Sequence, residues 1–260
     1  MRDMKWRLVD DGPASGAWNM AVDEALLLGQ AAGNSPPTLR FYGWQPACLS
    51  LGRFQKLTDG QWQRLARAPV DLVRRPTGGR AVLHQHEVTY CAVFPESLLP
   101  PASRSIMGGY RWLSEGFLDG LRSLGVAADL GKADHGGGDG FNCFEAAARC
   151  DFVVDGRKLI GAAQFRHGGA VLQHGSLLLE IDRGLWSDLE LAGSAVSLRE
   201  LGIGGESAEI KTALKSGLTR RLDIEFCGAT IDDTERAVAH SLLKSKYATL
   251  RWNRFGKFGE

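Results

Sequence analysis

The sequence predicts an α+β fold in which a mixed, largely antiparallel central sheet is flanked by helices. Short alternating runs typical of strands are separated by Gly, Pro or charged turns. Stretches with helical periodicity interrupt these runs, and no regular strand–helix alternation is present. Of the 260 residues, 44% are hydrophobic and 23% charged, so the chain can bury a large core without disulfides or metals. We expect a single domain over residues 1–260.

The first half of the chain is expected to contain both element types. Residues 6–9 are expected to form a strand, and Ser15–Gln30 an amphipathic helix capped by Ser15. A long helix is expected over residues 103–124, where Gly125 ends it as a C-terminal cap. Between the two helices, a break at residues 33–37 leads to expected strands at residues 38–42, 48–52, 70–74, 81–84 and 88–94.

The second half begins with the segment predicted to be the most flexible, the glycine-rich residues 131–140 that lead to Cys143. Asp155-Gly156 is the strongest hairpin signal, because both residues tolerate the positive φ of a type I′ turn. Its expected arms are residues 150–154 and 157–165. After a Gly168-Gly169 turn, we expect a strand over residues 170–181 and a mainly helical region over residues 183–248.

Charge and cysteine content exclude several classes of function. The net charge of +1 provides no broad field for nucleic acid or an anionic membrane, so an acidic carrier protein would need a local basic patch. No apolar run is long enough to span a bilayer, and we expect a soluble, cytoplasmic protein. The five cysteines include no C-x-x-C pair and are expected to be free thiols. Cys48, Cys91 and Cys150 fit buried apolar positions, and Cys227 has no evident chemistry.

Arg74 to His84, with the sequence R-R-P-T-G-G-R-A-V-L-H, is the first segment that suggests chemistry. Its paired glycines, Gly78 and Gly79, allow backbone N–H groups to approach a ligand, although a plain hairpin explains them equally well. The segment lacks the G-K-[ST] ending of a phosphate loop, so glycine alone does not indicate a nucleotide site.

Two further segments have the pattern of a pocket wall. Strand alternation places Lys158 on one face with Ile160 and Ala162, which indicates either a pocket wall or a solvated lysine beside a turn. On the next strand, His174 and Ser176 share a face on either side of Gly175. This pattern fits a narrow slot with a polar end or a buried, hydrogen-bonded histidine.

His84 and His86 would share one side of a strand, which is a possible metal-binding arrangement. Glu87 is expected to point the opposite way from both, and no other ligand has a suitable spacing, so we expect no metal site. Cys143 is the candidate reactive thiol, because a segment that follows glycine-rich chain can be exposed and mobile.

Four motifs together resemble the biotin/lipoate protein ligase and octanoyltransferase superfamily, and the similarity extends from about Trp6 to Asp182. They are the segment at residues 74–84, N-C-F-E-A at residues 142–146, G-R-K-L-I-G-A-A-Q at residues 156–164 and L-Q-H-G-S-L-L at residues 172–178. The resemblance implies the mixed-sheet fold of biotin ligases and class II aminoacyl-tRNA synthetases. The C-F-[DE]-A motif that contains this cysteine resembles the motif of one branch of the superfamily. Members of that branch transfer octanoate through an acyl-enzyme.

By this resemblance, Cys143 is the acylated nucleophile and Lys158 the active-site lysine. Octanoyl-acyl carrier protein is the implied donor, and a lipoyl domain or glycine cleavage H-type protein is the implied acceptor. No cofactor, nucleic acid or membrane is implied. The small residues around Gly161 and Ala163 leave space for an acyl chain. The motif positions implied to line the acyl pocket are Arg75, Gly78, Gly79, His84, Gly161, His174, Gly175 and Ser176.

The implied mechanism needs no ATP, because a thioester donor is already activated. An ordinary cysteine is only slightly ionised at neutral pH, so Lys158 is expected to stabilise the thiolate and then the oxyanion. Backbone N–H groups near Gly78 and Gly79 are expected to add donors. His84, His174 or neutral Lys158 remain alternatives for deprotonating the acceptor lysine. Three other functions stay open: an ATP-dependent lipoate or biotin ligase, octanoyl transfer between lipoyl domains, and a non-catalytic acyl- or lipoyl-domain-binding module.

Overall fold

The computed structural model describes residues 4–132, 141–145, 151–191 and 193–258. Eight strands form one mixed sheet in the order β11-β1-β2-β6-β10-β9-β8-β7, and three strands form a small second sheet in the order β4-β3-β5. β1 runs parallel to both β11 and β2, whereas the other neighbours in the large sheet are antiparallel. The expected mixed, largely antiparallel sheet is therefore confirmed. The strands are β1 Met4–Ala14, β2 Thr38–Trp44, β3 Cys48–Leu51, β4 Asp71–Arg74, β5 Val82–His84, β6 Glu87–Pro95, β7 Asp129–Leu130, β8 Phe152–Val154, β9 Arg157–His167, β10 Ala170–Leu178 and β11 Ile224–Gly228.

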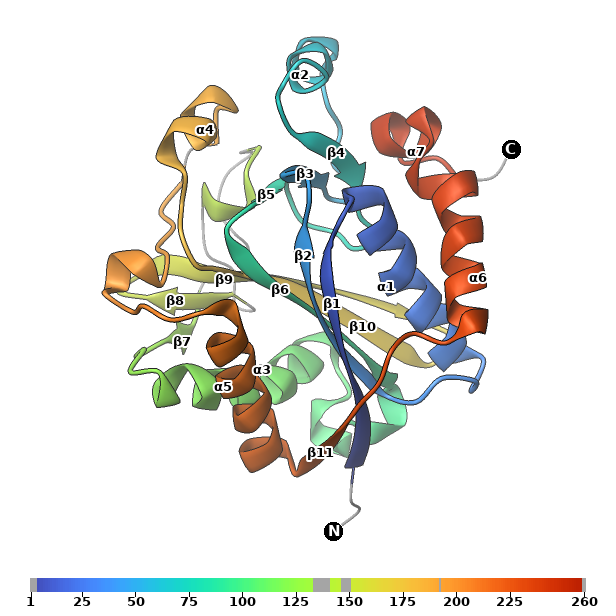
Figure 1. Cartoon of the computed structure of the whole chain (residues 1–260), viewed down its shortest axis with the longest axis vertical. Helices are drawn as coiled ribbons and strands as arrows, with labels where there is room; N and C mark the ends of the chain where they lie inside the picture. Colours follow the sequence, from blue (N-terminus) through green and yellow to red (C-terminus); the bar gives the residue numbers. More distant parts are fainter. Residues whose placement is uncertain (1–3, 133–140, 146–150, 192, 259–260) are drawn as a thin grey trace.

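Helices cover both faces of the large sheet. Figure 1 shows α1 beside α6 on one side of the molecule and α3 beside α5 on the other. The flanking helices expected from the sequence are therefore present. The helices are α1 Gly16–Ala31, α2 Asp59–Leu65, α3 Ile106–Ser123, α4 Arg183–Asp188, α5 Ser207–Leu222, α6 Asp233–Leu242 and α7 Leu250–Phe255, and a π-helical turn spans Leu243–Tyr247 between α6 and α7.

The strongest local signals in the sequence form the expected structures. Ser15 caps α1, since its hydroxyl accepts a hydrogen bond from Trp18 N at 3.3 Å. Asp155 and Gly156 both have positive φ, 50° and 75°, and join β8 to β9 as the hairpin pattern predicts. Gly168-Gly169 turns the chain from β9 into β10 with φ of 55° and 75°.

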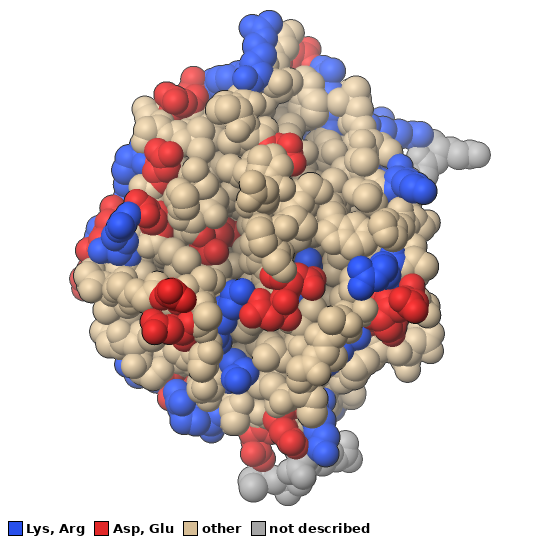
Figure 2. All heavy atoms as spheres, in the orientation of Figure 1, with Lys and Arg blue, Asp and Glu red and all other residues tan. Residues whose placement is uncertain are grey.

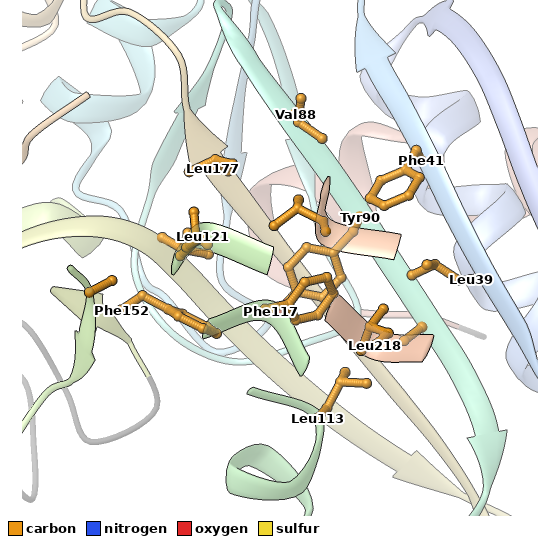
Figure 3. Close-up of a cluster of buried hydrophobic side chains, with 14 of the residues drawn as sticks. Leu39, Phe41, Val88, Tyr90, Leu113, Phe117, Leu121, Phe152, Leu177 and Leu218 are labelled. Carbon is orange, nitrogen blue, oxygen red and sulfur yellow. The ribbon is translucent and has the colours of Figure 1, made fainter. Parts of the chain in front are cut away.

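The core beneath α3 and α5 is built from apolar side chains of several elements (Figure 3). The Phe117 ring lies 4.3 Å from the Tyr90 ring and 6.3 Å from the Phe152 ring, measured between centroids. Burying each such side chain contributes roughly 1.5–3 kcal/mol. Gly217 of α5 lies so close to α3 that an added Cβ would be 2.3 Å from both Gly116 O and Gly120 N, so the two helices pack backbone to backbone.

Several elements differ from expectation; β7 was not predicted, and β1 spans Met4–Ala14 rather than residues 6–9. Helix α2 was not predicted, although Thr58 and Gln61 form a capping box at its start. β11 lies within the region expected to be mainly helical. It is a mostly exposed edge strand, and its pairing with β1 has no local signal. β10 ends at Leu178 rather than at residue 181. The flexible segment expected at residues 131–140 falls mostly, and Cys150 entirely, outside the described residues.

Within the described residues, no helix combines the length and apolar character that a membrane crossing requires.

Candidate active site

Cys143 is held beside the Arg74–His84 segment by backbone pairing. Cys143 N donates to Ala81 O at 2.8 Å, and Ala81 N donates to Phe141 O at 3.1 Å. Cys143 is the first residue of the short 3-10 helix Cys143–Glu145. Asn142 precedes this helix, and its Oδ1 accepts a hydrogen bond from Phe144 N at 3.1 Å. The thiol is partly exposed, in contrast to Cys48 and Cys91, which are buried as expected and whose pKa values burial raises.

Lys158 directs its amine to Cys143. Nζ lies 3.1 Å from Cys143 Sγ and 3.0 Å from Cys143 O. The side chain is 1% exposed, so the solvated-lysine interpretation is wrong. Gly161 leaves the required space, since a Cβ there would lie 3.0 Å from Lys158 Cε. Lys158 therefore reaches the thiol from β9 by passing close to Gly161. A larger residue at position 161 would push the lysine away.

Asp151 is the counter-ion of Lys158, and no pattern in the sequence predicted this role. Its Oδ2 lies 2.7 Å from Lys158 Nζ, and the two side chains are 3% and 1% exposed. Burial by itself would lower the pKa of Lys158, but the charges of Cys143 and Asp151 outweigh that effect and raise the pKa. Lys158 is therefore a cation at neutral pH.

Arg75 organises the glycine turn from inside. Its guanidinium donates to Gly78 O at 2.7 Å and to Arg80 O at 2.8 Å, and Gly79 adopts a φ of 90° against it. Among the residues that the structure describes, no carboxylate forms an ion pair with Arg75. Burial lowers the pKa of Arg75, while the nearby Cys143 raises it. A second buried positive charge therefore lies near the thiol.

His84 belongs to a hydroxyl–imidazole–carboxylate chain. Its Nε2 lies 2.7 Å from Ser50 Oγ and its Nδ1 lies 2.7 Å from Glu87 Oε1, while its ring stacks on Trp44 at 3.9 Å. The expectation that Glu87 points away from His84 is wrong, because residues 85–86 interrupt the strand and reverse its alternation. Ser176 also donates to Glu87 Oε1, at 2.8 Å.

No metal site is evident around His84. His86 is exposed, so the two histidines do not share a buried face. Within the described residues, no cluster of three or more His, Cys, Asp or Glu side chains has a metal-binding arrangement.

His174 belongs to a second chain of the same kind. Its Nε2 lies 2.7 Å from Thr77 Oγ1, and its Nδ1 lies 3.1 Å from Asp23 Oδ2. Burial lowers the pKa of His174 despite the opposing effect of Asp23, so the imidazole is neutral at neutral pH. Burial would raise the pKa of Asp23, but His174 and Arg40 together lower it.

Arg75 connects the two chains through their hydroxyls. It donates to Ser50 Oγ at 3.1 Å and to Thr77 Oγ1 at 3.2 Å. Because guanidinium N–H groups only donate, each hydroxyl accepts from Arg75. Arg75 therefore fixes the position of both hydroxyls beside the histidines.

The two chains border a pocket of about 430 Å³ that Cys143 also lines. Among the positions implied by the resemblance, Gly78 and Lys158 do not line it; Gly78 supplies a carbonyl to Arg75, and Lys158 contacts Cys143. The expected residues that line the pocket are Arg75, Gly79, His84, Cys143, Gly161, Ala163, His174, Gly175 and Ser176. The residues that the sequence analysis missed are Met20, Tyr42, Trp44, Ser50, Val82, Thr89 and Ala162.

Most of the missed residues come from elements distant in sequence, such as α1 and β2, whose approach to the pocket depends on strand order. Ala162 is the exception. It shares the predicted face with Lys158, which could have identified it.

A mixed sheet that holds a thiol and a buried lysine beside a pocket fits an enzyme domain of the acyl-transferring class. Residues 15–213 match the model of the lipoyl protein ligase A/B catalytic domain, and the chain belongs to this family. The octanoyltransferase LipM of Kyrpidia tusciae is 39% identical, over 95% of this chain and 98% of the relative. The octanoyltransferase LipM of Bacillus subtilis is 37% identical, and the match covers 97% of this chain and 99% of the relative.

Solved structures share the fold over nearly the whole chain. A lipoate-protein ligase A structure with bound ATP is 26% identical and superimposes with a TM-score of 0.80, covering 96% of this chain and 99% of the other. A bi-partite lipoate protein ligase from Thermoplasma acidophilum gives a TM-score of 0.75 at 24% identity and 99% coverage of both chains. At 24% identity, the similarity to the Thermoplasma acidophilum protein concerns the fold alone.

Proposed function

We propose that this chain transfers an octanoyl group from octanoyl-acyl carrier protein to a specific lysine of a lipoyl domain through a thioester on Cys143. The observation that carries the proposal is the 3.1 Å approach of Lys158 Nζ to Cys143 Sγ beside a 430 Å³ pocket. The octanoyl group itself is supported by relatives that are named octanoyltransferases and match along almost their whole length.

In the first half-reaction, Cys143 Sγ attacks the carbonyl carbon of the donor thioester. A new C–S bond to Cys143 forms, the C–S bond to the carrier breaks, and the carrier thiol leaves with the proton that Cys143 gave up. Lys158 and Arg75 place two positive charges where the thiolate and then the oxyanion carry negative charge. The buried setting strengthens both interactions.

In the second half-reaction, the acceptor lysine amine attacks the Cys143 thioester. A C–N bond forms and the C–S bond breaks. Lys158 is a cation and does not take the proton of the amine, so His84 and His174 remain the candidate bases, and either imidazole would pass the proton on to the sulfur. The proton lost by the amine therefore ends on the departing Cys143 sulfur, which restores the starting thiol.

The pocket suits a linear acyl chain. Gly161, Ala162 and Ala163 keep one wall free of bulky side chains, and Met20 and Val82 add apolar surface. The chain can therefore lie in the pocket while its carbonyl remains at Cys143.

An ATP-dependent lipoate ligase is the second candidate, because the 26%-identical solved structure is a lipoate-protein ligase bound with ATP. Such an enzyme would need ATP and the free acid, whereas the proposed transferase needs neither. The two candidates therefore differ in the co-substrate that produces an acylated product.

The test is to incubate the purified protein with octanoyl-loaded acyl carrier protein without ATP and to record intact and peptide masses before and after neutral hydroxylamine. We expect one octanoyl adduct on the Cys143 peptide that hydroxylamine removes. Octanoyl-loaded lipoyl domain as an alternative donor tests transfer between lipoyl domains. Product formation only with ATP and free acid would contradict the thioester scheme and favour the ligase.

A further inference from the structure

Two segments that adjoin the active site form a basic and apolar surface, here called the basic patch and defined as residues 53–56 and 250–258. They contain Arg53, Lys56, Arg251, Arg254 and Lys257 and no acidic residue. The whole chain has a net charge of only +1, so the rest of the molecule is net negative. In Figure 2, basic side chains lie along the top and upper right of the molecule, where Figure 1 places α2 and α7.

The basic patch also exposes large apolar side chains. Phe54 is 79% exposed, Phe255 59% and Phe258 55%. Together with Leu250, the patch provides four of the five mostly exposed large hydrophobic side chains in the described part of the chain. Exposed aromatic groups among cations are typical of a surface that binds a protein partner.

Arg74 holds the two segments together as one surface. Its guanidinium donates to Gln55 O at 2.7 Å and to Arg254 O at 3.1 Å. The Arg53 guanidinium lies 5.3 Å from the Trp252 ring, and an added Cβ on Gly256 would be 3.0 Å from Arg53 O. The patch is therefore built on a rigid base rather than on two independent loops.

The same segments contact the active site. Arg53 N donates to Thr77 O at 2.8 Å, and Gln55 Nε2 donates to Phe141 O at 2.9 Å. Gly52 lies directly against the glycine turn, since a Cβ there would be 1.8 Å from Gly79 O. A partner seated on the patch would therefore lie beside the pocket and Cys143.

We propose that the basic patch is the docking surface for the acidic carrier protein that delivers the octanoyl thioester, a proposal that rests on the proposed function. Arg254 is already paired with Asp59 of α2 at 2.6 Å, and an acidic surface complements the other four cations of the patch. The arm of an acyl carrier bears a phosphate, whereas the acceptor presents an ammonium that the patch would repel. The apolar rim at Phe54 shields an acyl chain from water during its entry into the pocket, and a lysine side chain has no such need.

The test compares two charge-reversal double variants that each change the net charge equally. Arg251→Glu/Lys257→Glu alters the patch, and Arg111→Glu/Arg122→Glu alters exposed positions of α3 on the other face of the sheet. Acylation of Cys143 is followed with octanoyl-acyl carrier protein and with octanoyl-N-acetylcysteamine, a small thioester without a protein. A third assay follows transfer from the acylated enzyme to a lipoyl domain.

We expect the patch variant to lose about tenfold or more in kcat/KM with the carrier at low salt, and to acylate normally with the small thioester. The α3 variant should keep its rate with the carrier. Equal loss in both variants, or loss confined to the lipoyl-domain step, would overturn the assignment to the donor. If the wild-type protein is not acylated at Cys143 by octanoyl-acyl carrier protein, the proposed function fails and the docking assignment fails with it.

Discussion

The carboxylate of Asp151 lies 2.7 Å from the amine of Lys158, and both side chains are almost completely buried. Lys158 in turn lies 3.1 Å from Cys143 Sγ, so the three side chains form one charge-coupled group. The carboxylate neutralises the lysine whenever the sulfur is uncharged, as in the free thiol or the thioester. In the proposed mechanism, the lysine would therefore keep its charge through both half-reactions.

Lys158→Met should destabilise the protein, because it leaves the Asp151 carboxylate buried without its cation. We expect a loss of about 3–5 kcal/mol in the free energy of unfolding, measured by urea titration. Adding Asp151→Asn should restore most of that stability without restoring octanoyl transfer. A double variant that regained transfer would show that the cation is dispensable.

Asp151→Asn alone should make Cys143 react faster with iodoacetamide at a fixed, neutral pH. Without the carboxylate, the sulfur is the remaining group beside Lys158 that can neutralise it. The measurement is the rate of alkylation of the Cys143 peptide, resolved by mass spectrometry from the exposed Cys227. Asp129→Asn, at an exposed position of β7, is the control. A rate that stays the same or falls would contradict the coupling.

His174 should make the fold sensitive to mild acid. Burial lowers its pKa in the folded state, so as the pH falls through about 6.5 the unfolded chain binds a proton before the folded chain does. The free energy of unfolding therefore decreases between about pH 7 and pH 5. His174→Gln should reduce this decrease, whereas His167→Gln, at an exposed position, should not. Equal slopes for wild type and His174→Gln in urea titrations would refute this account.

Gly175→Ala should be harmful and Gly78→Ala should not. A Cβ at Gly175 would lie 2.7 Å from the Tyr90 ring and 2.9 Å from Gly161 O, whereas a Cβ at Gly78 meets nothing within 4 Å. We expect about 1–3 kcal/mol of destabilisation for Gly175→Ala. Gly78→Ala should stay within about 0.5 kcal/mol. Thermal and urea unfolding of both variants measures the difference, and similar values would refute the argument.

Local signals in the sequence predicted local structure well. The Ser15 cap and the Asp155-Gly156 turn depend on a few adjacent residues, and both form as expected. The resemblance in four motifs predicted the fold and the family, which the family model and the solved structures confirm. These features can be predicted without knowing which strands become neighbours in the sheet.

Features that depend on distant pairing were not predictable in this way. Strand alternation placed Glu87 away from His84, because the turn at residues 85–86 has no strong local mark. Asp151 contacts Lys158 across the β8–β9 hairpin, where a bulge changes the register. Ser50 reaches His84 only once β3 pairs with β5, and Thr77 reaches His174 only once its loop lies against β10.

The pairing of β11 with β1 also constrains how the chain is made. Met4 pairs with Ile224, so the ribosome releases one strand long before its partner. During most of synthesis, the open edge of β1 can pair with other extended segments or with other chains. Contacts between residues so far apart in sequence also slow folding. The large sheet is therefore completed only after synthesis reaches its last strand, and chaperones that cover the β1 edge until then would raise the yield of native protein.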